Sequence, residues 1–399
     1  MRNLIAFRLK PSFMIAMLLM VSFWSCKTTT PEPEPDKYLV AATPISEFTK
    51  TELQTRAGNF SALAASFVAY PAKVYKISYK TKNWDGTEVT ASGALIIPTS
   101  TSELSMISQQ HGTIRSDSDA PSNYASTSEA YLSGTLLASV GYIVACPDYI
   151  GYGTSKNVAH PYEHRETLAQ TSLDMIRACK EFIKKDAAIK WDNRLYITGY
   201  SQGGFATMAL QKKIEEETGT EFNLRASVCG AGAYNKTATM KALVTQKSGV
   251  AVASNNALYA WVLQTYNTVY KINRPMSFYF KEPFASQAQA NPLTANINVA
   301  FGNALTDAFV KGVTDGTDTA FLTATADNNV FDWAPKVTTR LYHGDADDLV
   351  PFLNSQTAFD AMKKKGSTSV SLYPLAGKTH NTAVEQYLFG AFEVFSSVK

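Results

Sequence analysis

From residue 74 onward the chain alternates short apolar runs with longer helical ones, and this order limits its possible folds more than any other feature. Residues 74–80 alternate apolar and polar side chains, Asp85-Gly86 is typical of a tight turn, and residues 88–97 return as a second strand. A hairpin followed by strand–helix alternation predicts an α/β fold, with a mostly parallel sheet and helices on both faces. Further strands are expected at 104–110, 142–146, 194–198, 226–229, 338–342 and 369–373, and helices near 126–139, 164–186, 202–217 and 381–396.

Residues 233–335 interrupt this alternation. A structureless loop of about a hundred residues would be unusual in a compact domain. The segment has a largely helical pattern, so we expect an inserted helical cap, or lid, that divides the main domain into residues 61–232 and 336–399. Its aromatic residues are expected to form the core of the cap, to line a substrate pocket, or both: Tyr259, Trp261, Tyr266, Tyr270, Phe278, Tyr279, Phe280 and Phe284.

Residues 1–25 are typical of a signal peptide. A basic start is followed by an apolar run, 13–24, that is too short to span a bilayer. Ser25-Cys26 resembles a bacterial lipobox, which predicts that Cys26 becomes the lipidated N-terminus of a secreted protein anchored in the bacterial envelope or at the cell surface. Ordinary secretion with an incidental cysteine is the alternative.

Residues 26–60 are expected to be a tether and an N-terminal extension. Residues 27–37 alternate proline with glutamate, which favours an extended polyproline II segment of roughly 30 Å.

The charge balance argues against a nucleic-acid partner. The whole chain has 37 basic and 34 acidic residues, and the predicted signal peptide contains Arg2, Arg8 and Lys10 but no acidic residue. The mature chain is therefore neutral and lacks the basic surplus of nucleic-acid-binding proteins. Contact with a membrane is expected only through the lipid anchor, and the oligomeric state stays open.

The segment around Ser201 is the strongest chemical motif. An apolar run, 195–198, leads into Gly199-Tyr200-Ser201-Gln202-Gly203-Gly204, and a helical run follows. A serine on a tight strand-to-helix turn needs very small neighbours, because adjacent strands pass close to it. Glycine at 199 and 203 meets this need, so Ser201 is predicted to be a nucleophile.

Such a serine needs a neighbouring base and an acid that orients the base. Among five histidines, only His380 follows the last expected strand, in a short polar loop before the final helix. The loop after strand 338–342 offers three acids, and Asp347 fits the usual Gly-x-x-Asp-x-x-Val-Pro arrangement. Asp345 and Asp348 are then expected to be turn residues. The chain order of serine, acid and histidine is the one found in hydrolases of this sheet type.

An ester's tetrahedral intermediate also needs preorganised N–H donors for its oxyanion. The first expected donor is the backbone N–H of Gln202, directly after the nucleophile. The second is expected in the loop after strand 104–110, where His111-Gly112-Thr113 points to the N–H of Thr113, with Gly112 as second choice.

No metal or organic cofactor is predicted. His160 and His164 are four residues apart, but Pro161 lies between them and no third ligand is near in sequence. The glycine pair at 151 and 153 lacks the third glycine of a dinucleotide-binding motif. The cysteines Cys146, Cys179 and Cys229 lie in apolar segments, as buried thiols do.

Taken together, these motifs resemble the α/β-hydrolase superfamily across residues 74–399. More narrowly, the chain is similar to the secretory lipase (lipase A-like) family, through Cys146–Gly153 (CPDYIGYG), His160-Pro161-Tyr162, the segment 199–204 and the His-Gly-Asp-Ala-Asp-Asp run at 343–348. The resemblance implies a serine esterase or lipase with a helical cap that acts on lipid or short-chain esters.

Three alternative functions stay open. A carbohydrate esterase that removes acetyl or feruloyl groups from glycans would use the same machinery. The Gly-x-Ser-x-Gly-Gly form also occurs in prolyl oligopeptidase-type peptidases, but only about 35 residues separate the proline-rich tether from the first expected strand, which leaves no room for their propeller domain. A non-catalytic surface-binding lipoprotein is disfavoured because every catalytic part is present.

Overall fold

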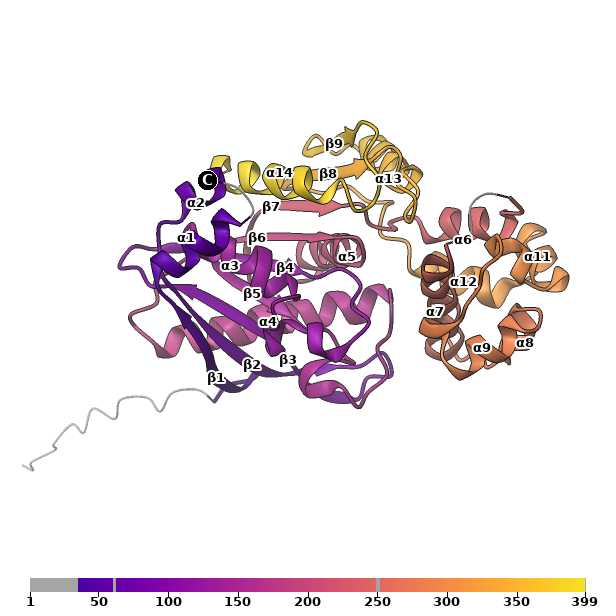
Figure 1. The fold of residues 1–399 in the computed structure, drawn as a ribbon, viewed down its shortest axis with the longest axis horizontal. Coiled ribbons are helices and arrows are strands. Elements are labelled where there is room, and N and C mark those ends of the chain that lie inside the picture. The colour runs from indigo at the N-terminus through magenta and orange to yellow at the C-terminus, as the bar shows by residue number, and fades with distance from the viewer. Residues whose placement is uncertain (1–34, 60–61, 249–251, 399) are drawn as a thin grey trace, which may run out of the picture. The chain divides into compact units, whose positions relative to one another are not determined.

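The computed structural model describes residues 35–59, 62–248 and 252–398. The predicted signal peptide, Cys26 and nearly all of the tether lie outside these residues. Within them, nine strands form one sheet in the order β1-β2-β3-β5-β4-β6-β7-β8-β9 (Figure 1). The strands of its larger half, from β5 to β9, are parallel to one another: β5 (Ile143–Pro147), β4 (Leu104–Gln110), β6 (Trp191–Tyr200), β7 (Asn223–Gly230), β8 (Thr338–Gly344) and β9 (Val370–Leu375).

The expected hairpin is present and begins the antiparallel part of the sheet. β2 (Ala72–Lys82) pairs with β3 (Glu88–Pro98) without a break, from Ala72 opposite Pro98 to Lys82 opposite Glu88. The turn between them closes through a 2.9 Å hydrogen bond from the N–H of Asn83 to the carbonyl of Thr87. The prediction of a mostly parallel sheet with an antiparallel N-terminal hairpin is therefore confirmed.

The sequence did not predict the first strand. β1 (Leu39–Phe48) pairs antiparallel with β2 and forms the edge of the sheet. Two helices follow it, α1 (Lys50–Gly58) and α2 (Ala62–Phe67). Much of the stretch expected to be an extension thus joins the sheet and its covering layer.

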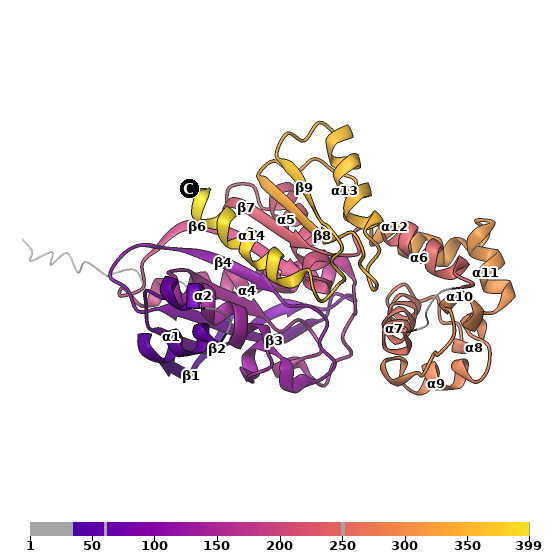
Figure 2. The same cartoon turned by 45° about the horizontal axis from the view of Figure 1, so that its top comes forward.

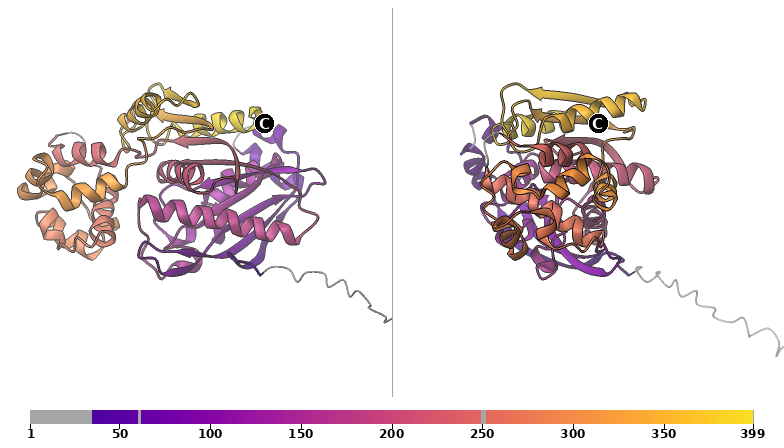
Figure 3. Two further views of the ribbon diagram at one scale, coloured as in Figure 1. Left: turned by 180° about the vertical axis from the view of Figure 1, so that it is seen from behind. Right: turned by 90° about the vertical axis from the view of Figure 1, so that its right-hand side faces the viewer.

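Helices cover both faces of the sheet, as expected (Figure 3). α4 (Arg165–Lys185) and α5 (Gln202–Glu217) pack on one face, where Met175, Leu195 and Leu210 share an apolar core. α13 (Leu353–Lys364), which was not expected, extends this layer beside β8 and β9. The opposite face is covered by α1, by a π-helical turn (Ala130–Gly134) that runs into α3 (Thr135–Ser139), and by α14 (Val384–Ser397).

Between β7 and β8 the chain forms the expected helical insertion (Figures 1 and 2). The insertion has its own aromatic core, which includes Phe301, Phe309 and Phe321. The same core takes in Tyr162 from the loop before α4, whose ring stacks on Trp261 with centroids 4.1 Å apart. Its helices are α6 (Lys236–Thr245), α7 (Ala253–Val269), α8 (Met276–Tyr279), α9 (Phe284–Ala290), α10 (Phe301–Ala304), α11 (Asp307–Thr314) and α12 (Thr319–Asp327).

In the described part of the chain, none of the helices combines the length and the apolar character that crossing a bilayer requires. Cys146, Cys179 and Cys229 are buried free thiols.

Candidate active site

Ser201 occupies the sharp turn between β6 and α5. Its backbone has φ 59° and ψ −123°, a region that non-glycine residues rarely adopt. The turn is held by close backbone packing: a Cβ on Gly203 would lie 2.1 Å from the carbonyl oxygen of Gln110, and one on Gly204 would lie 2.2 Å from that of Gly230. Glycine is therefore needed at both positions, and the strained turn lifts the Ser201 side chain out of the sheet.

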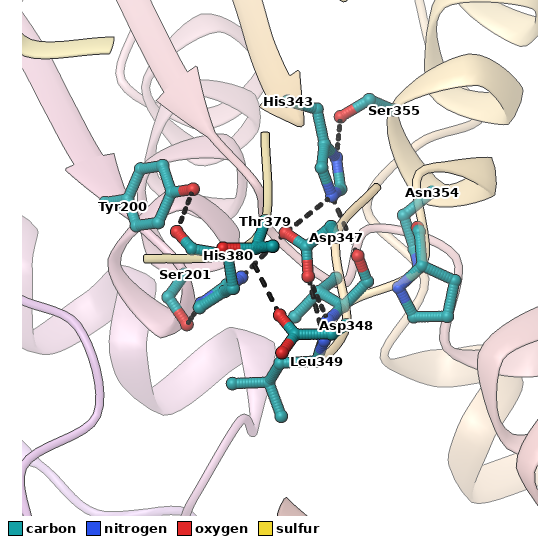
Figure 4. A network of polar contacts seen from close by, with 12 residues as sticks. Tyr200, Ser201, His343, Asp347, Asp348, Leu349, Asn354, Ser355, Thr379 and His380 are labelled. Carbon is teal, nitrogen blue, oxygen red and sulfur yellow. Dashed lines mark hydrogen bonds and ion pairs between the residues drawn. The ribbon is translucent and has the colours of Figure 1, made fainter. Parts of the chain in front are cut away.

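The side chains of Ser201, His380 and Asp347 form one hydrogen-bonded chain (Figure 4). Nε2 of His380 lies 2.9 Å from Oγ of Ser201, and Nδ1 of His380 lies 2.7 Å from Oδ2 of Asp347. The side chain of His380 is 8% exposed and that of Asp347 is fully buried. Tyr200 fixes the histidine loop by donating its hydroxyl to the carbonyl of His380 at 2.7 Å.

The carboxylate of Asp347 is surrounded by donors. Oδ1 accepts the backbone N–H groups of Leu349 and Val350 at 2.9 and 2.8 Å. Oδ2 lies 3.2 Å from Nε2 of His343 in addition to its contact with His380. Burial alone would raise the pKa of Asp347, but the hydrogen bonds from His343 and His380 outweigh it and hold the pKa below its ordinary value. The carboxylate is therefore ionised throughout the neutral range.

Asp345 and Asp348, the two other acids in the loop of Asp347, contact the backbone of the loop that contains His380. Oδ1 of Asp345 accepts the N–H of Gly377 at 2.7 Å, and Oδ1 of Asp348 accepts the backbone N–H of His380 at 3.3 Å. Both tie the acid loop to the histidine loop without reaching Nδ1 of the imidazole. Of the three acids, the structure brings only Asp347 to that nitrogen.

His343 is a member of the site that sequence reasoning did not single out. Its ring is fully buried, with Nδ1 2.7 Å from Oγ of Ser355 and Nε2 2.8 Å from the carbonyl of Val350. Since a carbonyl and a carboxylate both face Nε2, that nitrogen carries the hydrogen and donates to them. In the sequence, His343 was noted only as the first residue of the run 343–348, four residues before Asp347.

The expected oxyanion donor Gln202 is the first residue of α5, so its N–H has no carbonyl of the preceding turn to bind. Its side-chain amide lies 2.8 Å from Nε2 of His160, whose Nδ1 is 2.7 Å from the carbonyl of Ile150. Burial lowers the pKa of His160 to about 3, so the ring is neutral, donates through Nδ1 and accepts the Gln202 amide through Nε2. His160 thus supports the first helical turn behind Ser201.

The second expected donor region contains a carboxylate that the sequence did not reveal. The N–H of Gly112 donates to Oε1 of Glu129 at 2.8 Å, so this second-choice donor is already engaged. The hydroxyl of Thr113 lies 2.8 Å from that of Tyr162. Burial raises the pKa of Glu129, although the nearby His111 and the Gly112 hydrogen bond act in the opposite direction. The N–H of Thr113 stays a prediction.

Ser201 borders a cavity between the sheet and the helical insertion. The cavity has a volume of about 490 Å³ including its open mouth, and its wall is mostly apolar. It is lined by Tyr162, Glu163, Ser201, Ala233, Lys236, Thr239, Met240, Leu243, Leu258, Tyr259, Val262, Leu349 and Val350.

Three solved structures share the fold of this chain at low sequence identity. A Legionella pneumophila protein described as a hydrolase has a TM-score of 0.80 at 24% identity, covering 91% of this chain and 98% of its own. The rice cell wall degrading esterase LipA from Xanthomonas oryzae has a TM-score of 0.77 at 22% identity, with 90% and 97% covered. Candida antarctica lipase A in its closed state has a TM-score of 0.61 at 13% identity, with 90% and 83% covered.

At the level of sequence, no curated protein matches the chain. The model of the secretory lipase family, in contrast, matches residues 118–386, which include Ser201, Asp347 and His380. This match spans well over half of the chain and agrees with the α/β-hydrolase fold. The protein belongs to the secretory lipase family and is a carboxylic ester hydrolase.

Proposed function

We propose that the protein cleaves its ester substrates through an acyl-enzyme on Ser201. The observation that carries the proposal is the hydrogen-bonded chain from Oγ of Ser201 through the imidazole of His380 to the buried carboxylate of Asp347. Asp347 accepts the Nδ1 hydrogen of the neutral imidazole, which leaves the Nε2 lone pair facing the serine hydroxyl. The base is then correctly oriented before substrate arrives.

Each step follows from this orientation. Oγ of Ser201 attacks the ester carbonyl while His380 takes its proton, and the imidazolium that forms is stabilised by Asp347. The N–H groups of Gln202 and Thr113 bind the oxyanion. His380 then protonates the departing alcohol. The same imidazole next takes a proton from a water molecule, whose oxygen attacks the acyl carbonyl. The bond between the acyl carbon and Oγ then breaks, and His380 returns the proton to Ser201.

Labelling with a fluorophosphonate tests the nucleophile. We expect a single adduct in the wild-type protein, mapped by mass spectrometry to the peptide that contains Ser201. The Ser201→Ala variant should take up no label, whereas Ser396→Ala, at an exposed position in α14, should be labelled like the wild type. An adduct on another serine would reject the assignment.

The substrate is proposed to be a small-molecule, lipid or glycan ester. Rates on nitrophenyl esters from acetate to palmitate, measured beside aminoacyl amides, separate esterase, lipase and peptidase activities. We expect hydrolysis of the esters and none of the amides. Preferential cleavage of amides would instead favour the peptidase alternative.

Membership in a secretory family suggests export, and we propose that the exported protein is lipid-anchored at Cys26. In a bacterial host, the wild type should partition into the detergent phase and Cys26→Ser into the aqueous phase. Ser25→Ala keeps a small residue before the cysteine and should behave like the wild type. A wild-type protein without a lipid-sized mass increase at Cys26 would contradict the anchor.

A further inference from the structure

An ion pair lies in the wall of the cavity that borders Ser201. Lys236 is the first residue of α6, and its Nζ donates to Oε2 of Glu163, which lies in the loop before α4. The side chains of Lys236 and Glu163 are only 2% and 11% exposed. The pair therefore places a buried ammonium and a buried carboxylate beside an otherwise apolar substrate cavity.

Three local features make this ion pair an unfavourable choice if it served only to stabilise the fold. Removing two charges from water usually costs more than their mutual attraction returns, so apolar residues of similar size would serve packing better. A lysine in the first turn of a helix is repelled by the helix dipole. Glu163 has a backbone φ of 52°, in the left-handed region that costs a non-glycine residue energy. Unfavourable choices that coincide at one cavity wall indicate a function for it.

Most other polar side chains in the cavity wall are already hydrogen-bonded elsewhere. The hydroxyl of Tyr162 pairs with that of Thr113, the hydroxyl of Tyr259 donates to the carbonyl of Leu349, and the hydroxyl of Thr239 donates to the carbonyl of Asn235. Nζ of Lys236 lies over the ring of Phe205, 4.2 Å from its centre, and among the described residues its one hydrogen bond goes to Glu163, although an ammonium has three donors. Apart from Ser201, this ion pair is thus the main place in the cavity wall where a substrate can form hydrogen bonds.

We propose that Lys236 and Glu163 bind a hydroxyl group of the ester substrate. A hydroxyl can accept from the ammonium and donate to the carboxylate at the same time, whereas a substrate carboxylate would be repelled by Glu163 and an amine by Lys236. A plain alkyl chain would cover the pair without using its remaining hydrogen-bonding capacity. The preferred substrates are therefore hydroxylated esters, in which the hydroxyl belongs to the acyl group or to the alcohol.

This inference rests on the proposed function, because Ser201 defines the cavity as a substrate site. It is tested by kcat/KM for ester pairs that differ in one hydroxyl. For the acyl side the pairs are methyl para-hydroxycinnamate with methyl cinnamate and methyl omega-hydroxyhexanoate with methyl hexanoate. For the alcohol side the pair is glycerol monobutyrate with propyl butyrate. The wild type should prefer the hydroxylated member of at least one pair by about 10- to 100-fold, as expected for hydrogen bonds to charged groups.

The Lys236→Met/Glu163→Gln double variant removes both charges together, which avoids leaving one buried charge without its partner. We expect the preference to fall to within about threefold of unity. The Lys311→Met/Asp315→Asn double variant removes an exposed ion pair at α11, outside the cavity wall, and should keep the wild-type preference. Because the preference is a ratio within one protein sample, partial misfolding of a variant does not alter it.

Fluorophosphonate labelling separates this inference from the proposed function. A wild-type protein that is not labelled at Ser201 would contradict the proposed function. A labelled wild type that shows no preference in any ester pair, or a double variant that keeps the full preference, would overturn the hydroxyl site and leave the pair as a structural link.

Discussion

Asp347 is contacted by two imidazoles, and this double contact determines its behaviour with pH. His380 and His343 both reach Oδ2, while two backbone N–H groups bind Oδ1. The result is an acid whose pKa is lowered in the folded protein. Four groups thus contact the carboxylate of Asp347, and only one of them, His380, was among the expected catalytic residues.

This lowered pKa predicts how stability depends on pH. A group with a depressed folded-state pKa stabilises the fold above its ordinary pKa of 3.8, and this contribution is lost as the pH falls through the folded value. At pH 7 the Asp347→Asn variant should therefore unfold a few degrees below the wild type. Thermal midpoints of the two proteins should converge as the pH is lowered below about 4. A gap that stays constant down to pH 2 would contradict the assigned direction.

The same variant should be nearly inactive at neutral pH. With asparagine at 347 the imidazole of His380 is no longer held in the tautomer that frees Nε2, which costs on the order of 10⁴ in kcat. Asp348→Asn, which keeps an acceptor oxygen for the backbone N–H of His380 and loses only the charge, is the matched control and should keep most of the activity. Equal losses in the two variants would reassign the acid.

The hydrogen bond between Glu129 and Gly112 gives a prediction about kcat. Its carboxylate accepts the N–H of Gly112 and so orients the loop that leads into Thr113. Glu129→Gln keeps an acceptor oxygen and should retain kcat within about threefold. Glu129→Ala loses the acceptor and should lower kcat by about 10- to 100-fold with little change in KM, because one oxyanion donor contributes on the order of 10²–10³. If the alanine variant keeps its kcat, the loop does not depend on this contact.

Sequence reasoning at this scale finds residues that belong to local motifs. Ser201 and Asp347 each lie in a short pattern, and His380 was found by elimination along the chain. Glu129 and the Lys236–Glu163 pair act through partners that folding brings close, and Lys236 lies 73 residues from Glu163 in the chain. No local pattern marks such contacts, so they became visible only in the structure.

The elements themselves were predicted where periodicity is strong. The expected strand 104–110 and helix 202–217 match β4 and α5 in both bounds, and the other expected elements differ mainly at their ends. β1 was missed for physical reasons: as an edge strand it is exposed along much of its length, it contains Pro44, and its pairing with β2 is irregular there. An edge strand of this kind lacks the alternation by which strands are recognised.

The glycines of the turn at Ser201 give a prediction at the element scale. Alanine is normally better than glycine in a helix by about 1 kcal/mol. In α5, however, a Cβ on Gly204 would lie 2.2 Å from the carbonyl oxygen of Gly230 in β7. Gly204→Ala should therefore lower the urea midpoint and abolish labelling of Ser201, since neither backbone can give way easily. Gly58→Ala in α1 meets only a contact at 3.9 Å, so it should keep or raise the urea midpoint and leave the labelling unchanged. A stable, fully labelled Gly204→Ala variant would contradict the packing argument.

At the scale of the whole molecule, the helical insertion and the sheet are parts of one compact unit from Asp36 onward. Polar contacts join them at several points: Arg165 pairs with Asp327 at 2.7 Å, and Arg115 donates to the carbonyl of Ser254 at 2.8 Å. One contact reaches the acid loop, because the hydroxyl of Tyr259 donates to the carbonyl of Leu349 at 2.7 Å. Leu349 in turn donates its N–H to Asp347.

This last contact predicts that the insertion supports catalysis as well as covering the cavity. Tyr259→Phe removes one hydrogen bond from the acid loop, so kcat on a short ester should fall by up to about tenfold, the effect of about 1.4 kcal/mol. Tyr270→Phe removes a hydroxyl that contacts Asp327, far along the chain from the acid loop, and should lower the thermal midpoint without changing kcat. Equal kcat values for the two variants would mean that the insertion contributes packing alone. A lower kcat only in Tyr259→Phe would mean that the orientation of Asp347 depends on α7. A protein without the insertion would then lose catalytic rate as well as substrate selectivity.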